Sequence, residues 1–130
     1  DRKTIIENQL EDTDHDYLGK LITYASGKSA DIVIWVVKRA REEHRSAIEW
    51  LNNHTDENIA LFLVEIKLYQ IGSSDIAVKF EVVEKPNDWT RKPTESLYLI
   101  RQIFKIRISE QFDWAMDVAL KMKNTFKKYL

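Results

Sequence analysis

The residues with the clearest chemical potential lie within the first twenty-four positions of the chain. Glu7 and Gln9 are two apart in an apolar segment, so in a strand their carboxylate and amide share one face. Lys20 and Tyr24 are four apart in a segment with helical spacing, so they lie one turn apart on one surface. A strand that presents an acid and a polar partner toward a helix is typical of the divalent-metal site of a small nuclease.

The elements that must position these residues alternate between strand and helix. The pattern predicts the order βαβαββ, with elements at residues 3–9, 14–26, 32–37, 40–52, 59–71 and 76–84. The run at 32–37 is continuously apolar and β-branched, which indicates a central strand buried on both faces. Thr13 is the predicted N-cap of the first helix, with Asp16 three residues later. The sequence therefore predicts an α/β fold with a mixed sheet.

Charge is spread unevenly along the 130 residues, whose formal net charge is −1. Residues 1–84 hold 10 Lys and Arg against 16 Asp and Glu, and residues 85–130 hold 10 against 5. Residues 1–84 thus form an acidic front, which argues against simple binding of a phosphate backbone unless metal ions neutralise its carboxylates. The chain has no cysteine, which excludes zinc–thiolate sites and disulfides and fits a cytoplasmic protein. No apolar run approaches the ~20 residues that span a membrane.

We expect three parts along the chain: a core of residues 1–84, a connector of residues 85–95 that contains both prolines, and a helical tail of residues 96–130. Two helices are expected in this tail, and the second carries an apolar seam, formed by Phe112, Ala115, Ala119, Met122, Phe126 and Tyr129. A lone helix cannot bury such a seam. The tail is therefore expected either to form a homodimer or to fold back on its own sheet.

Several stretches together resemble the PD-(D/E)XK nuclease superfamily, the restriction-endonuclease-like proteins of bacteria and archaea that are often fused to a further C-terminal domain. The resemblance covers roughly residues 1–90 and leaves the tail outside. It is carried by IIENQLE at 5–11, TDH at 13–15, LGKLITYA at 18–25, VIW at 33–35, REEHR at 41–45, WLN at 50–52, FLVE at 62–65 and KPNDW at 85–89.

The resemblance implies a restriction-endonuclease-like mixed sheet flanked by helices, and a site that cleaves DNA with Mg²⁺ or Mn²⁺. Glu7 matches the acid of the (D/E)XK half of the family motif, which is a metal ligand. Gln9 stands where that motif usually has a lysine. Lys20 and Tyr24 match helix positions that face the site, so Lys20 is expected to replace the missing positive charge. The carbonyl of residue 6 or 8 is a further candidate ligand.

One departure from the family pattern concerns the first acid. The family places an Asp on a strand before the one that carries the glutamate, whereas here only Asp1 precedes Glu7, six residues ahead. We therefore expect the core to lack its N-terminal strands and the metal site to be incomplete in the sequence given.

Simpler roles are open for other polar residues of the core. Asp14, His15 and Asp16 suit the start of a helix, where capping and the dipole favour acids. His44 lies among charged helix residues and is expected to be solvated. Glu7 itself could pair with a lysine.

Four charged residues and three tryptophans also have structural explanations. Glu65 and Lys67 resemble a second acid–X–lysine pair, but cross-strand pairing explains them as well. Arg41 and Arg45 could touch phosphate, although a solvated helix face is the simpler interpretation. Core or lid packing is expected of Trp35, Trp50 and Trp89.

Two functions of different class follow from the sequence. The first is a divalent-metal-dependent DNA endonuclease, for which Glu7, Gln9 and Lys20 argue. The second is a non-catalytic module that keeps the fold to bind nucleic acid or a protein, with the tail as an oligomerisation element. The neutral Gln9 and the acidic front favour this second function.

Overall fold

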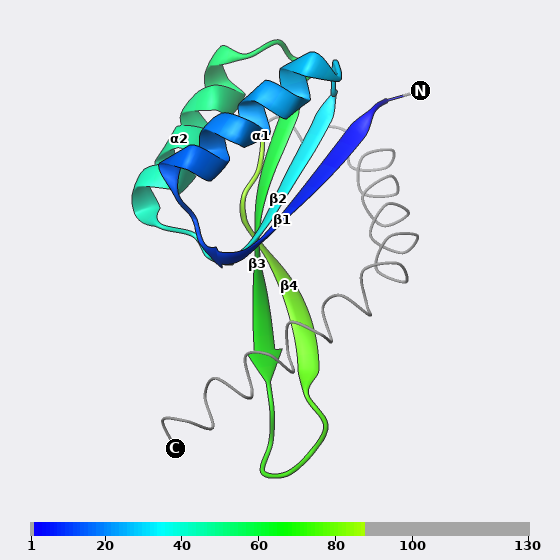
Figure 1. Cartoon of the computed structure of the whole chain (residues 1–130), viewed down its shortest axis with the longest axis vertical. Coiled ribbons are helices and arrows are strands. Elements are labelled where there is room, and N and C mark those ends of the chain that lie inside the picture. Colours follow the sequence, from blue (N-terminus) through cyan, green and yellow to red (C-terminus); the bar gives the residue numbers. More distant parts are fainter. Residues whose placement is uncertain (1, 88–130) are drawn as a thin grey trace. The chain divides into compact units, whose positions relative to one another are not determined.

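The protein is described by a computed structural model that covers residues 2–87. It has an α/β fold with a mixed sheet and two helices, as predicted (Figure 1). The elements along the chain are β1 (Thr4–Asp12), α1 (His15–Gly27), β2 (Ile32–Arg39), α2 (Glu42–His54), β3 (Ala60–Tyr69) and β4 (Ala77–Glu84).

Within residues 2–87 the strands form one sheet in the order β1-β2-β3-β4. β2 pairs in parallel with β1 on one side and with β3 on the other. The register places Glu7 opposite Trp35 and Gln9 opposite Val37. The prediction that residues 32–37 form a central strand is therefore confirmed, and β4 lies at an edge of the described sheet.

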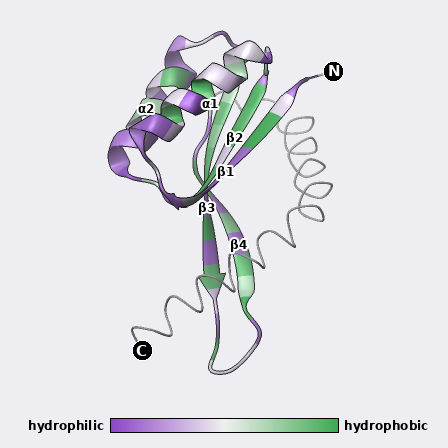
Figure 2. Ribbon diagram, in the orientation of Figure 1, coloured by the Kyte–Doolittle hydropathy of each residue, from purple (hydrophilic) through white to green (hydrophobic). Residues whose placement is uncertain are grey.

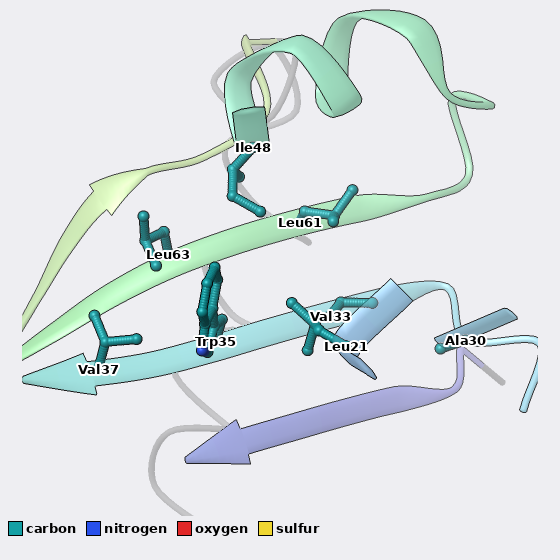
Figure 3. Packing of buried hydrophobic residues seen from close by; sticks show 8 residues of the cluster. All are labelled: Leu21, Ala30, Val33, Trp35, Val37, Ile48, Leu61 and Leu63. Atoms are coloured by element: carbon teal, nitrogen blue, oxygen red, sulfur yellow. The ribbon is translucent and has the colours of Figure 1, made fainter. Parts of the chain in front are cut away.

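Both helices lie on the same face of the sheet (Figure 1). Crossovers between parallel strands are right-handed, so two successive crossovers that proceed in the same direction along the sheet place their helices on the same face. The connections β1–α1–β2 and β2–α2–β3 do so. Under the helices lies a cluster of buried apolar side chains from β2, β3, both helices and the loop before β2 (Figure 3). Its members are Leu21, Ala30, Val33, Trp35, Val37, Ile48, Leu61 and Leu63.

The opposite face of β2 is buried too. Ile32, Ile34 and Val36 alternate with the cluster residues along the strand and are each at most 4% exposed. Two-sided burial explains why the strand is continuously apolar rather than alternating. The outward surface of α2, in contrast, is largely hydrophilic (Figure 2).

The start of each helix differs from the prediction. Asp14, not Thr13, is the N-cap of α1, and its Oδ1 accepts a hydrogen bond from the Tyr17 amide at 2.6 Å. Thr13 is instead fully buried, because its hydroxyl is engaged with α2. Helix α2 begins at Glu42 rather than at residue 40, because the backbone of Arg41 is extended, with φ of −76° and ψ of 148°. The Ala40 amide, before the helix, donates to Glu65 Oε1 at 2.9 Å.

Contacts divide the described residues into two units. The first contains residues 2–67 and 80–87, and the second contains residues 68–79, where the chain turns at Gly72 with φ of +56°. The expected tail of residues 96–130, its seam and most of the 85–95 connector lie outside the described residues. Neither helix among residues 2–87 is long and apolar enough to cross a membrane.

The amide of Asn52 joins α2 to β3. Its Nδ2 donates to the Leu61 carbonyl and its Oδ1 accepts from the Leu61 amide, both at 2.9 Å. Replacing Asn52 with Ala leaves both backbone groups of Leu61 without this partner. We expect the free energy of unfolding to fall by about 1–3 kcal/mol, measured by urea denaturation. Glu49→Ala, on the exposed side of the same helix, should change it by less than about 0.5 kcal/mol.

Candidate functional site

A hollow of about 330 Å³ lies between β1 and α1. Glu7 lines it from the strand, and the other lining residues come from the helix: Tyr17, Lys20, Leu21 and Tyr24. Lys20, Leu21 and Tyr24 follow Tyr17 by three, four and seven residues, so the four side chains form a single stripe along α1. Three of the four predicted site residues, Glu7, Lys20 and Tyr24, thus surround one space.

Tyr17 is the side chain that fixes the corner between β1 and α1. Its hydroxyl donates to the Asn8 carbonyl at 3.0 Å. Its ring stacks on Trp35 with 6.4 Å between centroids and an angle of 5°, and Lys20 Nζ lies 6.0 Å from the ring centroid. Burial, followed by the nearby Glu7 carboxylate, raises the pKa of Tyr17 above 10. The phenol therefore stays protonated and remains a donor.

Gln9 does not line the hollow, although it shares a strand face with Glu7. The residue is 4% exposed, and its Nε2 donates to the Asp12 carbonyl at 2.9 Å and to Asp14 Oδ2 at 2.7 Å. Asp14 in turn accepts from the Tyr17 amide. Gln9 therefore holds the turn between β1 and α1, and this bonding gives its amide a structural role that sequence spacing did not indicate.

The oxygen atoms near the hollow bear on its capacity for a metal ion. Glu7 supplies a carboxylate. Gln9 Oε1 is a buried amide oxygen without a partner in the structure, but Gln9 does not line the hollow. The Asn8 carbonyl, a predicted candidate ligand, already accepts from Tyr17. Among residues 2–87, no three or more His, Asp or Glu side chains group to hold a metal ion. One lining carboxylate does not form a closed metal site, and an ion held there would have to keep most of its waters, as Mg²⁺ can.

A second polar feature, a row of three hydrogen-bonded side chains, lies beside this corner. Thr13 Oγ1 is 2.8 Å from His44 Nδ1, and His44 Nε2 is 2.8 Å from His15 Nδ1. Thr13 Oγ1 also accepts from the Arg41 amide at 2.9 Å. Every group is satisfied when the Thr13 hydroxyl donates to His44 and His44 Nε2–H donates to His15. The row joins the start of α1 to the start of α2.

The prediction that His44 is a solvated side chain is wrong, because the residue is 1% exposed. His44, Ala47, Ile48 and Leu51 are spaced three, one and three apart, which is the inward stripe of α2. That spacing was the available signal, and the charged neighbours of His44 concealed it. Asp14 and Asp16 stand at the start of α1 as expected, with Asp14 as its cap.

The remaining candidates have structural partners or no contact with the hollow. Glu65 accepts from the Ala40 amide, and Lys67 Nζ lies 2.6 Å from Glu81 and 3.5 Å from Glu65. Arg45 pairs with Glu84 at 3.4 Å. The three tryptophans differ: Trp35 is fully buried, Trp50 is 59% exposed, contrary to the packing role expected of it, and Trp89 lies outside the described residues.

Comparison with known proteins gives no relative from which a role could be transferred. The chain matches no family model, no curated protein and no solved structure. The geometry of the corner between β1 and α1 is therefore the basis for any functional assignment.

The row of Thr13, His44 and His15 predicts a dependence of stability on pH. Burial lowers the pKa of His44 below 6.5, and His15 lowers it further. Arg41 acts in the same direction, whereas Glu43 and Asp14 act against it. The unfolded chain thus takes up a proton on His44 at a higher pH than the folded chain does.

We therefore expect stability to be fully present above about pH 6.5 and to fall as the pH drops below that value. Urea denaturation between pH 8 and pH 5 measures the effect, and His44→Gln should reduce the slope below pH 6.5 while lowering stability by about 1–3 kcal/mol at all pH values. A slope lost equally in His54→Gln, which removes an exposed histidine from the same helix, would contradict the assignment to His44.

The hydroxyl of Tyr17 provides a second prediction. Tyr17→Phe keeps the ring on Trp35 but removes the bond to the Asn8 carbonyl. We expect the free energy of unfolding to fall by about 0.5–1.5 kcal/mol. Tyr24→Phe, a change at an exposed ring of the same helix, is the matched control. An equal loss in the two variants would show that the Asn8 bond does not stabilise the corner.

Proposed function

We propose that this chain carries the metal-binding side of a divalent-metal-dependent DNA endonuclease with a restriction-endonuclease-like fold. The observation that carries the proposal is that Glu7 and Lys20 line one hollow between β1 and α1. In metal-assisted hydrolysis of a phosphodiester a carboxylate holds the cation, and a further positive charge that faces the phosphate stabilises the charge that develops there. One strand and the helix that comes after it supply both groups.

Glu7 is the residue proposed to hold Mg²⁺ or Mn²⁺. Such an ion takes one or two carboxylates together with phosphate oxygens and keeps several waters. When bound, the ion would supply a water of lowered pKa and stabilise negative charge on the phosphate. The hollow is lined by one carboxylate from residues 2–87, so phosphate oxygens and water would complete the coordination.

Lys20 is the residue proposed to supply the positive charge that the resemblance assigns to the position of Gln9. The Gln9 amide is neutral and is engaged by Asp12 and Asp14. Lys20 lines the hollow from α1 on a long and flexible side chain, so its ammonium can approach a phosphate oxygen beside Glu7. Tyr17 is proposed to act indirectly, by holding the backbone between Glu7 and Gln9 through the Asn8 carbonyl.

A second candidate function is a non-catalytic module that binds DNA or a protein through the same fold. One observation favours it: the described residues bring a single carboxylate to the hollow and group no three metal-binding side chains anywhere. A surface of this kind could retain a ligand at Lys20 and the tyrosines without cleaving it.

Cleavage of plasmid DNA by the full 130-residue chain in Mg²⁺ or Mn²⁺ tests the endonuclease. We expect Glu7→Gln to lower the rate by more than about 100-fold, because the loss of residues that merely support a metal ligand already costs about 10–100-fold. Glu49→Gln, which removes an exposed carboxylate on α2, is the matched control and should cleave at the wild-type rate.

The outcomes separate the two functions. Equal cleavage by Glu7→Gln and the wild type would leave the carboxylate without the proposed role. A wild type that binds DNA through Lys20 in the presence of either ion, and leaves the DNA intact, would support the non-catalytic module for the 130-residue chain.

A further inference from the structure

The hollow has an aromatic rim that the proposed chemistry does not use. Tyr24 lines the hollow and is 49% exposed, so its ring is accessible to a ligand. Tyr17, the other ring, already stacks on Trp35 and has the Lys20 ammonium on its ring at 6.0 Å. Tyr24 is therefore the aromatic surface in the hollow that remains for a ligand to contact.

Charge limits the kind of nucleic acid that this surface can accept. Residues 2–87 hold 11 Lys and Arg against 15 Asp and Glu. Lys20 is the one cation among the residues that line the hollow. Duplex DNA is held mainly by many simultaneous phosphate contacts, each of which releases counterions. A ligand held by one phosphate contact and by stacking fits this site better than a duplex does.

The size of the hollow also favours a single nucleotide over a duplex. A volume of about 330 Å³ lies at the lower end of the range for small-ligand sites, which is about 300–1,000 Å³. In a duplex the flat faces of the bases are covered by their neighbours, and a side chain reaches such a face only when the base is unpaired or extruded. Among the parts of a nucleic acid, an exposed base face is the one that can stack on the ring of Tyr24.

We propose that the hollow binds an unpaired nucleotide of single-stranded DNA, with the base stacked on Tyr24 and the adjacent phosphate at Lys20. This inference rests on the same site as the proposed endonuclease and names its substrate class. Stacking on aromatic side chains tolerates any base, because every base has a π-face. The site therefore selects for single-strandedness and not for sequence.

Fluorescence anisotropy with the full 130-residue chain tests the inference. The probe is a labelled DNA strand of about 12 nucleotides, within the ~4–16 nucleotides of common single-strand sites, alone or annealed to its complement. EDTA is present so that cleavage does not occur. We expect the single strand to bind at least about 10-fold more tightly than the duplex, since the duplex hides its base faces.

Matched variants test the two contacts. Tyr24→Ala should weaken single-strand binding by about 5- to 150-fold, the range for loss of one stacked base, whereas Tyr24→Phe should retain it because the ring remains. Lys20→Ala should weaken binding and reduce its salt dependence. The controls are Ile22→Ala, an exposed apolar residue of the same helix, and Lys38→Ala, an exposed lysine on β2. Both controls should bind as the wild type does.

Two results would overturn the inference: duplex binding as tight as single-strand binding, or unchanged binding by Tyr24→Ala. Its failure is distinguishable from failure of the endonuclease. Glu7-dependent cleavage of duplex DNA without preference for single strands supports the endonuclease and refutes the single-strand site. Tyr24-dependent single-strand binding without cleavage in Mg²⁺ or Mn²⁺ supports the site and counts against endonuclease activity of the 130-residue chain.

Discussion

Parallel pairing of β1 with β2 is the constraint on which the candidate site depends. Two parallel neighbours cannot be joined by a tight turn, so the chain must cross over the sheet between them. The crossover is α1, which starts three residues after β1 ends and runs back along the strand that carries Glu7. A stripe of side chains on α1 is thereby brought beside that carboxylate. The pairing of β2 with β3 requires α2 in the same way.

Directional polar contacts, more than apolar packing, set the geometry where β1 gives way to α1. Three polar residues within the described part of the chain are almost completely buried, namely Gln9, Thr13 and His44. Each has at least one hydrogen-bond partner at this corner, which offsets part of the cost of removing it from water, although Gln9 Oε1 has no partner in the structure. Hydrogen bonds accept a narrow range of distances and angles, which makes the corner more precisely shaped than an apolar contact would.

The layout of strands and helices could be predicted because it depends on apolar periodicity. The run at 32–37 permitted one interpretation, a strand buried on both faces, and the structure has it. The grouping of Glu7, Lys20 and Tyr24 followed from two local spacings and one short turn. Such inferences need only neighbours in sequence.

The polar partners could not be predicted because they depend on contacts between distant residues. Thr13 and Asp14 are both good N-caps, and the choice between them is made by His44, thirty-one residues from Thr13. The use of Gln9 as a brace depends on how the turn folds back to place Asp14 against it. His44 was misjudged for a related reason, since its burial depends on where α2 docks.

The spacing of the hollow-lining residues on α1 also determines where the chain can change length. Each residue added to a helix rotates the remainder of that helix by about 100°, so one inserted residue between Asp14 and Tyr17 would turn Lys20 and Tyr24 away from Glu7. Gln9 and the Tyr17 amide both donate to Asp14, so the turn cannot take up the rotation without breaking one of these hydrogen bonds. The turn around Gly72 is exposed, and the hydrogen bonds of Gln70 and Ile71 there are made to Ser74, a near neighbour in sequence. Insertions and deletions should accumulate in that turn, while the corner keeps a constant number of residues.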